Sequence, residues 1–217
     1  MWGVIKLVNH MLSLIKDKLA KHEPRELMRH MAEGMPEAGV LIPIISAVDS
    51  PRIILTQRAA NLSTHRGEVA FPGGKMDESD ESLEFTALRE AQEEIGLEPS
   101  LVKMVGAMGP VVSRFGIKVT PYVGLVPEDV ESSLTPNEGE IANIFSVPIS
   151  FFLEGKRLRT DEISFRGATL FIPAYEYDGF HIWGLTAIML SEFLNTVFDA
   201  GIDLTKAPES GELKTYP

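Results

Sequence analysis

The sequence contains no cysteine at any of its 217 positions. Disulfide bonds, thiol-based catalysis and cysteine-ligated zinc are therefore excluded as sources of stability or chemistry. A chain without cysteine fits a reducing compartment, and we expect a cytoplasmic protein. The sequence also lacks an apolar run of the roughly 20 residues that a membrane-spanning helix needs, so we expect no membrane span.

Positive charge is scarce as well. Twenty lysines and arginines face 31 acidic residues, which gives a formal net charge of −11. General attraction to nucleic acid is therefore not expected, because binding to a polyanion needs a basic surface. A protein of this charge that handles a phosphorylated small molecule must gather positive charge locally, from a few arginines and from bound metal. The length is sufficient for one sizeable core and too short for two ordinary domains.

Apolar residues recur at helical spacing in residues 1–22, and lysines occupy the rest of the helical wheel. This segment does not read as a signal peptide, because Lys6 and the pair Asn9-His10 interrupt its apolar run. We expect a helix that packs on the domain or on a second copy of the chain, which would make a homodimer. A helix lying on a membrane surface is the alternative.

The remaining chain alternates strand and helix signals, which favours an α/β fold, specifically an α/β/α sandwich around a mixed β-sheet. We assign residues 1–37 to an N-terminal helical extension with a second short helix, residues 38–204 to the main domain, and residues 205–217 to a flexible tail. Strands are expected at 40–48 (with an edge or bulge at Pro43), 52–58, 101–108, 117–126, 157–166, 168–177 and 180–184, and helices at 149–154 and 185–200.

One stretch organises the chain: the pair Gly73-Gly74 and the acidic helix that follows it. We expect Ser79 or Asp80 to cap the start of this helix and Gly96 to end it in a left-handed conformation. At about 100° per residue, the helix has an apolar side opposite a side with three converging carboxylates. The apolar side consists of Phe85, Leu88, Ala91 and Ile95, and the acidic side of Glu90, Glu93 and Glu94.

These three glutamates repel one another, and the helix dipole disfavours each by about 0.3–1 kcal/mol near a C-terminus. A hard divalent cation offsets this cost. Mg²⁺ prefers oxygen ligands and commonly binds through one or two carboxylates together with a substrate phosphate. A solvated acidic face, partly neutralised by a pair between Arg89 and Glu93, is the alternative. The glycine-rich loop before the helix favours the metal site.

The run Arg89-Glu90-Ala91-Gln92-Glu93-Glu94-Ile95-Gly96-Leu97, placed after Gly73-Gly74, resembles the Nudix box, the signature of the Nudix hydrolases. Those enzymes cleave nucleoside diphosphates linked to a further group. The family pattern is a glycine, five residues, a glutamate, seven residues and then Arg-Glu. Here seven residues separate Glu81 from Arg89, but six separate Gly74 from Glu81. The resemblance covers about residues 38–200 and implies the Nudix fold with Mg²⁺ or Mn²⁺ as cofactor.

The resemblance also implies roles for acids outside and inside the box. Glu140 precedes an apolar residue and a Phe-x-Val-Pro run, as does an acid that approaches the metal in many Nudix enzymes, as a ligand or as a base for water. Glu138 is the second choice for that position. Within the box, the implied roles are direct metal ligation by Glu90 and Glu94, ligation or base catalysis by Glu93, and orientation of the glutamates by Arg89.

A second motif precedes the box. Leu55-Thr56-x-Arg58, a basic loop and then Gly67-x-x-x-Phe71-Pro72-Gly73-Gly74 resemble the motif of the coenzyme A pyrophosphatase subfamily. Coenzyme A carries a pyrophosphate and a separate 3′-phosphate, and forked guanidinium donors suit phosphate oxygens. Ser63 stands where the subfamily usually has arginine. Arg58, His65, Arg66, Gly73 and Gly74 are the implied substrate-binding residues, the glycines because a missing Cβ permits close approach.

The expected function is therefore metal-dependent hydrolysis of coenzyme A or its derivatives, giving 4′-phosphopantetheine and adenosine 3′,5′-bisphosphate. Two alternatives remain open. One is a less selective pyrophosphohydrolase that acts on ADP-ribose, NADH or dinucleoside polyphosphates, which Ser63 favours. The other is a Nudix-fold binding module without catalysis.

Overall fold

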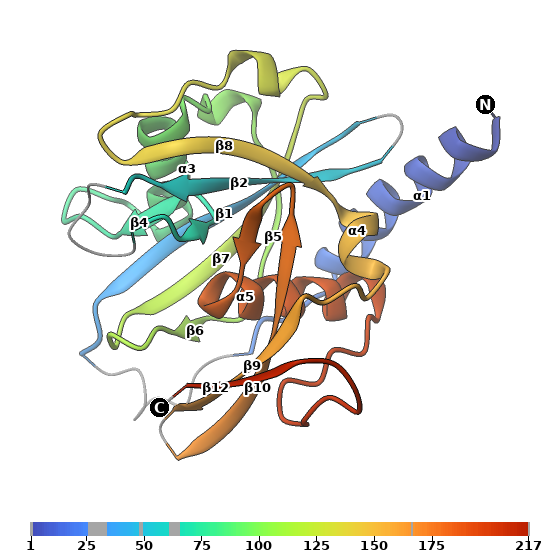
Figure 1. Ribbon diagram of the computed structural model, residues 1–217. Helices are drawn as coiled ribbons and strands as arrows, with labels where there is room; N and C mark the ends of the chain where they lie inside the picture. Colours follow the sequence, from blue (N-terminus) through green and yellow to red (C-terminus); the bar gives the residue numbers. More distant parts are fainter. Residues whose placement is uncertain (1, 26–33, 48–49, 61–65, 166, 217) are drawn as a thin grey trace.

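The computed structural model describes residues 2–25, 34–47, 50–60, 66–165 and 167–216 (Figure 1). The second helix expected within residues 23–36 falls mainly on residues 26–33, outside the described ranges. The helices are α1 (Trp2–Leu19), α3 (Leu83–Ile95), α4 (Ile149–Leu153) and α5 (Gly184–Phe198), with short 3-10 turns at Pro99–Leu101 and Val130–Ser133. The strands are β1 (Glu37–Ile45), β2 (Arg52–Arg58), β3 (Val69–Ala70), β4 (Gly73–Lys75), β5 (Lys103–Ala107), β6 (Val111–Val112), β7 (Lys118–Val126), β8 (Ile141–Pro148), β9 (Arg159–Phe165), β10 (Ala168–Tyr177), β11 (Phe180–Ile182) and β12 (Leu213–Tyr216).

The main sheet is mixed, with the strand order β3-β2-β1-β7-β5. β1 pairs in parallel with β7 along its whole length and antiparallel with β2. Three further strands pair with strands of this order: β4 pairs with β1, β6 with β7, and β8 with β2. The expected hairpin of β1 and β2 is present, and so is the mixed sheet.

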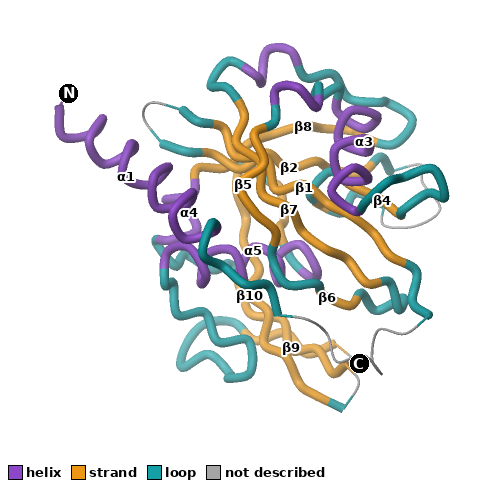
Figure 2. The backbone as a smooth tube through the Cα atoms, turned by 180° about the vertical axis from the view of Figure 1, so that it is seen from behind, coloured by secondary structure: helices purple, strands orange, loops and turns teal. Residues whose placement is uncertain are grey.

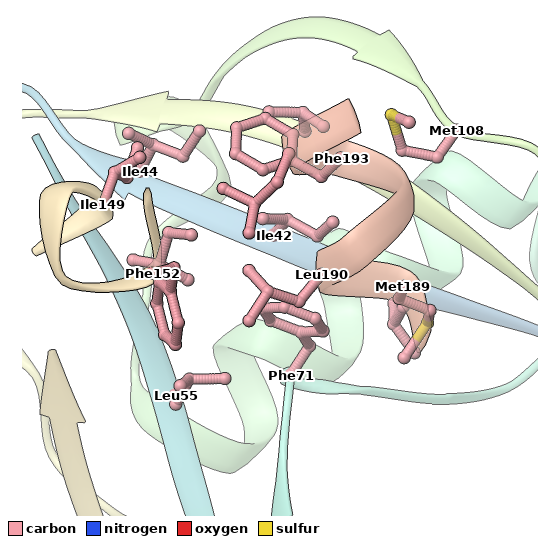
Figure 3. Packing of buried hydrophobic residues seen from close by; sticks show 14 of the residues in the cluster. Ile42, Ile44, Leu55, Phe71, Met108, Ile149, Phe152, Met189, Leu190 and Phe193 are labelled. Carbon is pink, nitrogen blue, oxygen red and sulfur yellow. The ribbon is translucent and has the colours of Figure 1, made fainter. Parts of the chain in front are cut away.

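Alternating side chains of β1 divide the core into two layers. Val40, Ile42 and Ile44 pack into the cluster that contains Phe193 of α5, whereas Leu41 and Ile45 pack against Ala87 and Ala91 of α3. Figures 1 and 2 show α3 and α5 on opposite faces of the sheet, and Figure 3 shows the packing of the α5 layer. The expected α/β/α sandwich is confirmed.

Pro43 lies inside β1, where it faces Gly124 in the parallel ladder with β7. On its other side, β1 pairs with β4 through residues 38–40 and with β2 through residues 44–45. The proline thus falls between two pairings, where its missing N–H is not needed. β1 is an internal strand with an unbroken ladder to β7, so the expected edge or bulge at Pro43 is not found, and the gap between the two antiparallel pairings accommodates the proline instead.

The N-terminal helix α1 contacts α5 and β5. Ile15 and Leu19 in its C-terminal half are buried in the main core, and Lys18 donates to Asp199 at 2.9 Å. This half of the expected extension therefore packs on the domain of its own chain. Association with a second copy stays a prediction.

A second, four-stranded sheet has the order β11-β10-β9-β12. The expected pair of strands β9 and β10 is present, but the expectation of a wholly loose tail is wrong at residues 213–216. These residues form β12, which pairs in parallel with β9. The buried carboxylate of Asp161 binds Arg159 at 2.7 Å, and Arg159 also contacts the Tyr216 hydroxyl, so side chains as well as the ladder hold this strand. The tail has little apolar periodicity, which explains why the sequence did not indicate it.

Candidate active site

The Gly73-Gly74 pair forms the start of β4 and runs beside β1. Gly73 has φ +151°, which disfavours other residues, and a Cβ there would lie 2.5 Å from the carbonyl oxygen of Gly39. A Cβ on Gly74 would collide with the carboxylate of Glu90. The two glycines thus let the acidic helix and β1 approach this loop. Their expected contact with substrate stays a prediction.

The start of α3 differs from expectation. Neither Ser79 nor Asp80 caps it; Ser82 does, because its extended backbone immediately precedes the first helical residue and its Oγ accepts a hydrogen bond of 3.1 Å from the Phe85 N–H. Gly96 ends the helix with φ 68°, as predicted.

The orientation of α3 also corrects the predicted faces. Phe85 is 45% exposed, whereas Glu94 is only 4% exposed. The buried arc is centred between Ala87 and Ala91, because these small residues let the helix lie close against the sheet. Glu94 falls within that arc, so it points toward the sheet and not away from it.

Glu94 is held between the glycine loop and the end of β2. Its Oε2 accepts a hydrogen bond of 3.1 Å from the Gly73 N–H, and its Oε1 lies 3.4 Å from Nη1 of Arg58. Burial raises the pKa of Glu94 to about 7, against the opposing effects of the Gly73 N–H and Arg58. The pKa is raised further by the negative charges of Glu90 and Glu140.

Glu90 is half-buried one helical turn before Glu94, beside Gly74. Burial raises its pKa, and the charges of Glu93 and Glu140 act in the same direction, while Arg89 lowers it. Two neighbouring carboxylates with raised pKa values mark a place where a cation would stabilise the ionised forms.

Arg89 is the centre of an ionic cluster. It binds both oxygens of Asp80 at 2.9 and 3.0 Å, and its Nη1 donates to Glu90 at 3.0 Å and to Glu93 at 3.1 Å. Its Nη2 also donates to the carbonyl oxygen of Lys75 in the glycine loop, at 3.3 Å. These contacts raise the pKa of Arg89, with the hydrogen bonds to Asp80 as the largest cause. The expected role of Arg89 in orienting the glutamates stays a prediction.

Asp80 is the main partner of Arg89, a role that the sequence analysis did not predict for it. Its side chain has no exposed surface, and it accepts hydrogen bonds from the Thr86 hydroxyl at 2.8 Å and the Asp77 N–H at 3.0 Å, besides those from Arg89. The Arg89 hydrogen bonds are the largest cause of a pKa well below the usual range. Glu81, the expected counterpart, is exposed. Five residues separate Gly74 from Asp80, the family spacing, so the extra residue lies between Asp80 and Arg89.

The structure describes three of the four remaining predicted site residues, Glu140, Arg58 and Arg66, but not His65. Glu140 ends the loop before β8, where its carbonyl oxygen accepts from the Ala59 N–H at 2.8 Å, and its charge influences both Glu90 and Glu94. Arg58 is one-quarter exposed, and its buried Nε has no hydrogen-bond partner. Arg66 lies exposed in the turn before β3, and His65 lies outside the described residues.

The three box glutamates do not converge as expected. Within the described ranges, no group of three His, Asp or Glu side chains is close enough to hold a metal ion. Glu93 is 59% exposed and turned to Arg89, and Glu94 is turned to the sheet. Two carboxylates, Glu90 and Glu94, remain near each other, a number that suits Mg²⁺ when water and a substrate phosphate supply the other ligands.

Comparisons with known proteins agree with this geometry. The family model described as the NUDIX domain matches residues 35–164. Nudix hydrolase 15, mitochondrial, of Arabidopsis thaliana is 38% identical over 167 residues, which are 75% of this chain and 59% of the plant protein. The uncharacterized Nudix hydrolase NudL of Citrobacter koseri is 40% identical over 156 residues, which are 72% of this chain and 80% of that protein.

Among solved structures, a MutT/nudix family protein from Enterococcus faecalis matches with a TM-score of 0.51 at 14% identity, over 89% of this chain and 74% of that one. This likeness concerns the fold alone. None of the helices in the described ranges has the length and apolar character to cross a bilayer.

Proposed function

The chain belongs to the Nudix hydrolase family, and on that premise we propose that it is a metal-dependent hydrolase of a nucleoside diphosphate linked to a further group. The observation that carries the proposal is the pair Glu90 and Glu94 on α3. Both carboxylates are partly or fully buried, both have raised pKa values, and both adjoin the glycine loop. A helix built for stability alone would not bury two acids side by side.

The donor set fits a hard divalent cation, Mg²⁺ or Mn²⁺, with Glu90 and Glu94 as its protein ligands. Burial and mutual repulsion disfavour the ionised carboxylates, and a cation relieves both. When bound, such an ion neutralises charge on phosphoryl oxygens and lowers the pKa of a coordinated water. Family members generally use divalent metal ions, and the kind of metal is part of the proposal.

The chain's own residues have separable roles. Arg89 holds Glu90 and Glu93 in place, since its Nη1 donates to both. Glu93 and Glu140 are the two candidates for the base that accepts a proton from the attacking water, and Glu93 is the more exposed carboxylate of the box. Arg58 is the candidate for contact with a substrate phosphate, because its guanidinium is partly exposed beside Glu94.

The substrate that we favour is coenzyme A or a derivative, on the basis of the motif from Leu55 to Gly74. Hydrolysis breaks one P–O bond of the diphosphate bridge. The water oxygen bonds to one phosphorus, and the protons end on the two phosphate products or in solvent. The products are 4′-phosphopantetheine and adenosine 3′,5′-bisphosphate. The guanidinium of Arg58 at the end of β2 supports this proposal, because it lies beside Glu94.

Steady-state assays with coenzyme A, ADP-ribose, NADH and dinucleoside polyphosphates, each with Mg²⁺ and with Mn²⁺, test the proposal. We expect the highest kcat/KM with coenzyme A or one of its derivatives. A preference for any other substrate contradicts the subfamily assignment and favours the less selective hydrolase, which Ser63 supports. Absence of turnover with every substrate would leave a binding module.

A cytoplasmic location remains part of the proposal, supported by a sequence without cysteine. Association of two chains through α1 also remains a proposal.

A further inference from the structure

A groove of about 290 Å³ lies between β8 and the segment that precedes it. Leu134 and Pro136 of that segment form one wall, and Ile54 and Ile144 of the sheet supply further apolar surface. Figure 1 shows residues 127–139 passing beyond β8, over the same end of the molecule as α3. The proposed function assigns no role to this groove.

Both walls of the groove are connected to residues of the proposed active site. Next to Pro136, the Asn137 N–H donates to the carbonyl oxygen of Glu94 at 2.9 Å, so this wall is fixed to the last turn of α3. On the other side, Asn143 lies three residues beyond Glu140, which is roughly 10 Å along an extended strand. A substrate with its diphosphate near Glu94 can therefore extend into the groove.

The chemistry of the groove selects an uncharged group. Of the described residues that line it, none is lysine or arginine, and Glu131 adds a negative charge. The Ser146 hydroxyl donates to Glu131 at 2.6 Å and accepts from Arg52 at 2.7 Å, so this carboxylate has a fixed position. The carboxylate of Glu131 disfavours a phosphate in the groove, whereas groups with N–H or O–H donors find an acceptor there.

The backbone of β8 adds a second recognition element. In the described sheet, β2 is the one strand that pairs with β8, so β8 is an edge strand. Edge strands bind extended amide-bearing chains through backbone N–H and C=O groups, with alternate side chains providing apolar contact. Asn143 and Ile144, which line the groove, belong to this edge.

Resting on the proposed function, we infer that the groove between β8 and residues 131–136 binds the neutral, amide-bearing arm of the substrate, which in coenzyme A is the pantetheine arm. Its apolar walls accommodate the carbon chain, and Glu131 and the β8 edge accommodate the amides. The groove thereby selects diphosphates that carry a long neutral amide chain over those that carry a second sugar or nucleoside.

The exposed side chain of Ala142 lines the groove, so the substitution Ala142→Trp fills it without disturbing the core. Ala168→Trp, at an exposed strand position in the second sheet, is the matched control. We expect Ala142→Trp to lower the ratio of kcat/KM for coenzyme A to that for ADP-ribose at least about tenfold, mainly through the KM for coenzyme A. Ala168→Trp should retain the wild-type ratio.

Direct binding of free pantetheine, followed by saturation-transfer NMR, separates this inference from the proposed function because it needs no turnover. Pantetheine should bind the wild type and Ala168→Trp, and Ala142→Trp should abolish the signal. The inference is overturned if pantetheine does not bind the wild type, if it binds Ala142→Trp equally, or if adenosine displaces it from the groove. Turnover of coenzyme A by the wild type would leave the proposed function standing in each of those cases.

Discussion

Arg89 and Arg58 contact different glutamates of the box, and their surroundings differ. Arg89 has short contacts to Asp80, Glu90 and Glu93 and a hydrogen bond to the glycine loop. Arg58, among the described residues, has a single ion pair of 3.4 Å with Glu94, and its buried Nε has no partner. A guanidinium with several short contacts organises its neighbours, whereas a partly exposed one with a single long ion pair is less constrained and can contact a ligand. This difference supports the proposal that Arg89 maintains the architecture of the site and that Arg58 binds substrate.

Removing the charge that faces Arg58 should have the largest effect. We expect Glu94→Gln to lower kcat at least about 100-fold, beyond the 10–100-fold loss typical of outer-shell partners, because it removes a proposed direct metal ligand. Steady-state kinetics at saturating metal measure the loss. The exposed Glu84→Gln on the same helix is the control and should retain wild-type kcat. Activity within tenfold of wild type would show that Glu94 is not a ligand.

The same substitution should not destabilise the metal-free protein at alkaline pH. The pKa of Glu94 is raised to about 7 from an ordinary 4.5, so the protonated carboxyl is favoured in the folded state. The protonated carboxyl of Glu94 makes its full contribution to the free energy of unfolding below pH 4.5. That contribution is lost as pH rises through 7, which lowers the free energy of unfolding by roughly 3 kcal/mol. Thermal melts in a chelator should therefore show Glu94→Gln equal to wild type at pH 5 and more stable at pH 9.

Removing Asp80, the main partner of Arg89, should have the next largest effect on kcat. Unlike Glu94→Gln, this substitution should lower the stability of the protein. We expect Asp80→Ala to lower kcat about 10–100-fold, because Arg89 then no longer fixes Glu90. Its Tm should fall by several degrees at neutral pH. The pKa of Asp80 is lower in the folded state than in the unfolded state. The ionised Asp80 therefore stabilises the fold at pH values above the ordinary aspartate pKa, and this stabilisation is lost as the pH falls through the folded-state pKa. The Tm gap should narrow toward acid pH.

The exposed neighbour Glu81 provides the control for Asp80. Glu81→Ala should retain both Tm and kcat. Losses of Tm and kcat in Glu81→Ala that exceed those in Asp80→Ala would mean that the family's acid before the helix is Glu81.

Substitution of Arg58 itself should affect binding more than architecture. We expect Arg58→Ala to raise KM about tenfold through the lost phosphate contact. The charge of Arg58 also lowers the pKa of Glu94, so that pKa should rise and the acid limb of the pH–rate profile should move to higher pH. Arg58→Lys should restore the acid limb but not KM, because an ammonium keeps the charge and loses the fork. An unchanged pH profile in Arg58→Ala would contradict the coupling to Glu94.

The smallest effect is expected at the helix start, away from both arginines. Ser82→Ala should cost about 1 kcal/mol of unfolding free energy, because the Phe85 N–H loses its acceptor. Chemical denaturation measures this loss. The kcat should stay at the wild-type value, and a fall in kcat would mean that the helix start and the glutamates are mechanically coupled.

The sequence was sufficient to predict the sandwich and the end of α3 at Gly96, because these depend on local periodicity and a compact motif. The roles of the charged residues of α3 stay predictions. It was not sufficient to orient α3. Phe85 is apolar and Glu94 is charged, so periodicity alone placed them the wrong way round. Their orientation is decided by the close approach of Ala87 and Ala91 to the sheet, a tertiary effect that overrides the apolar pattern.

Asp80 illustrates a second limit. Its spacing from Gly74 fitted the family pattern, but the pattern asks for glutamate, so the neighbouring Glu81 drew the assignment. Only the geometry shows that the shorter side chain reaches Arg89 while also accepting from Thr86. The C-terminal strand β12 is comparable, since its partner β9 is about 50 residues away and no local signal predicts the pairing.

Isothermal titration calorimetry with Mn²⁺ and with Mg²⁺ tests most directly whether two buried carboxylates of α3 form a cation site. For the folded wild type we predict saturable uptake that is strengthened by a non-hydrolysed diphosphate and is lost in Glu90→Gln and Glu94→Gln variants that melt at or above the wild-type temperature. Absence of uptake by the folded wild type, with and without nucleotide, would contradict the account.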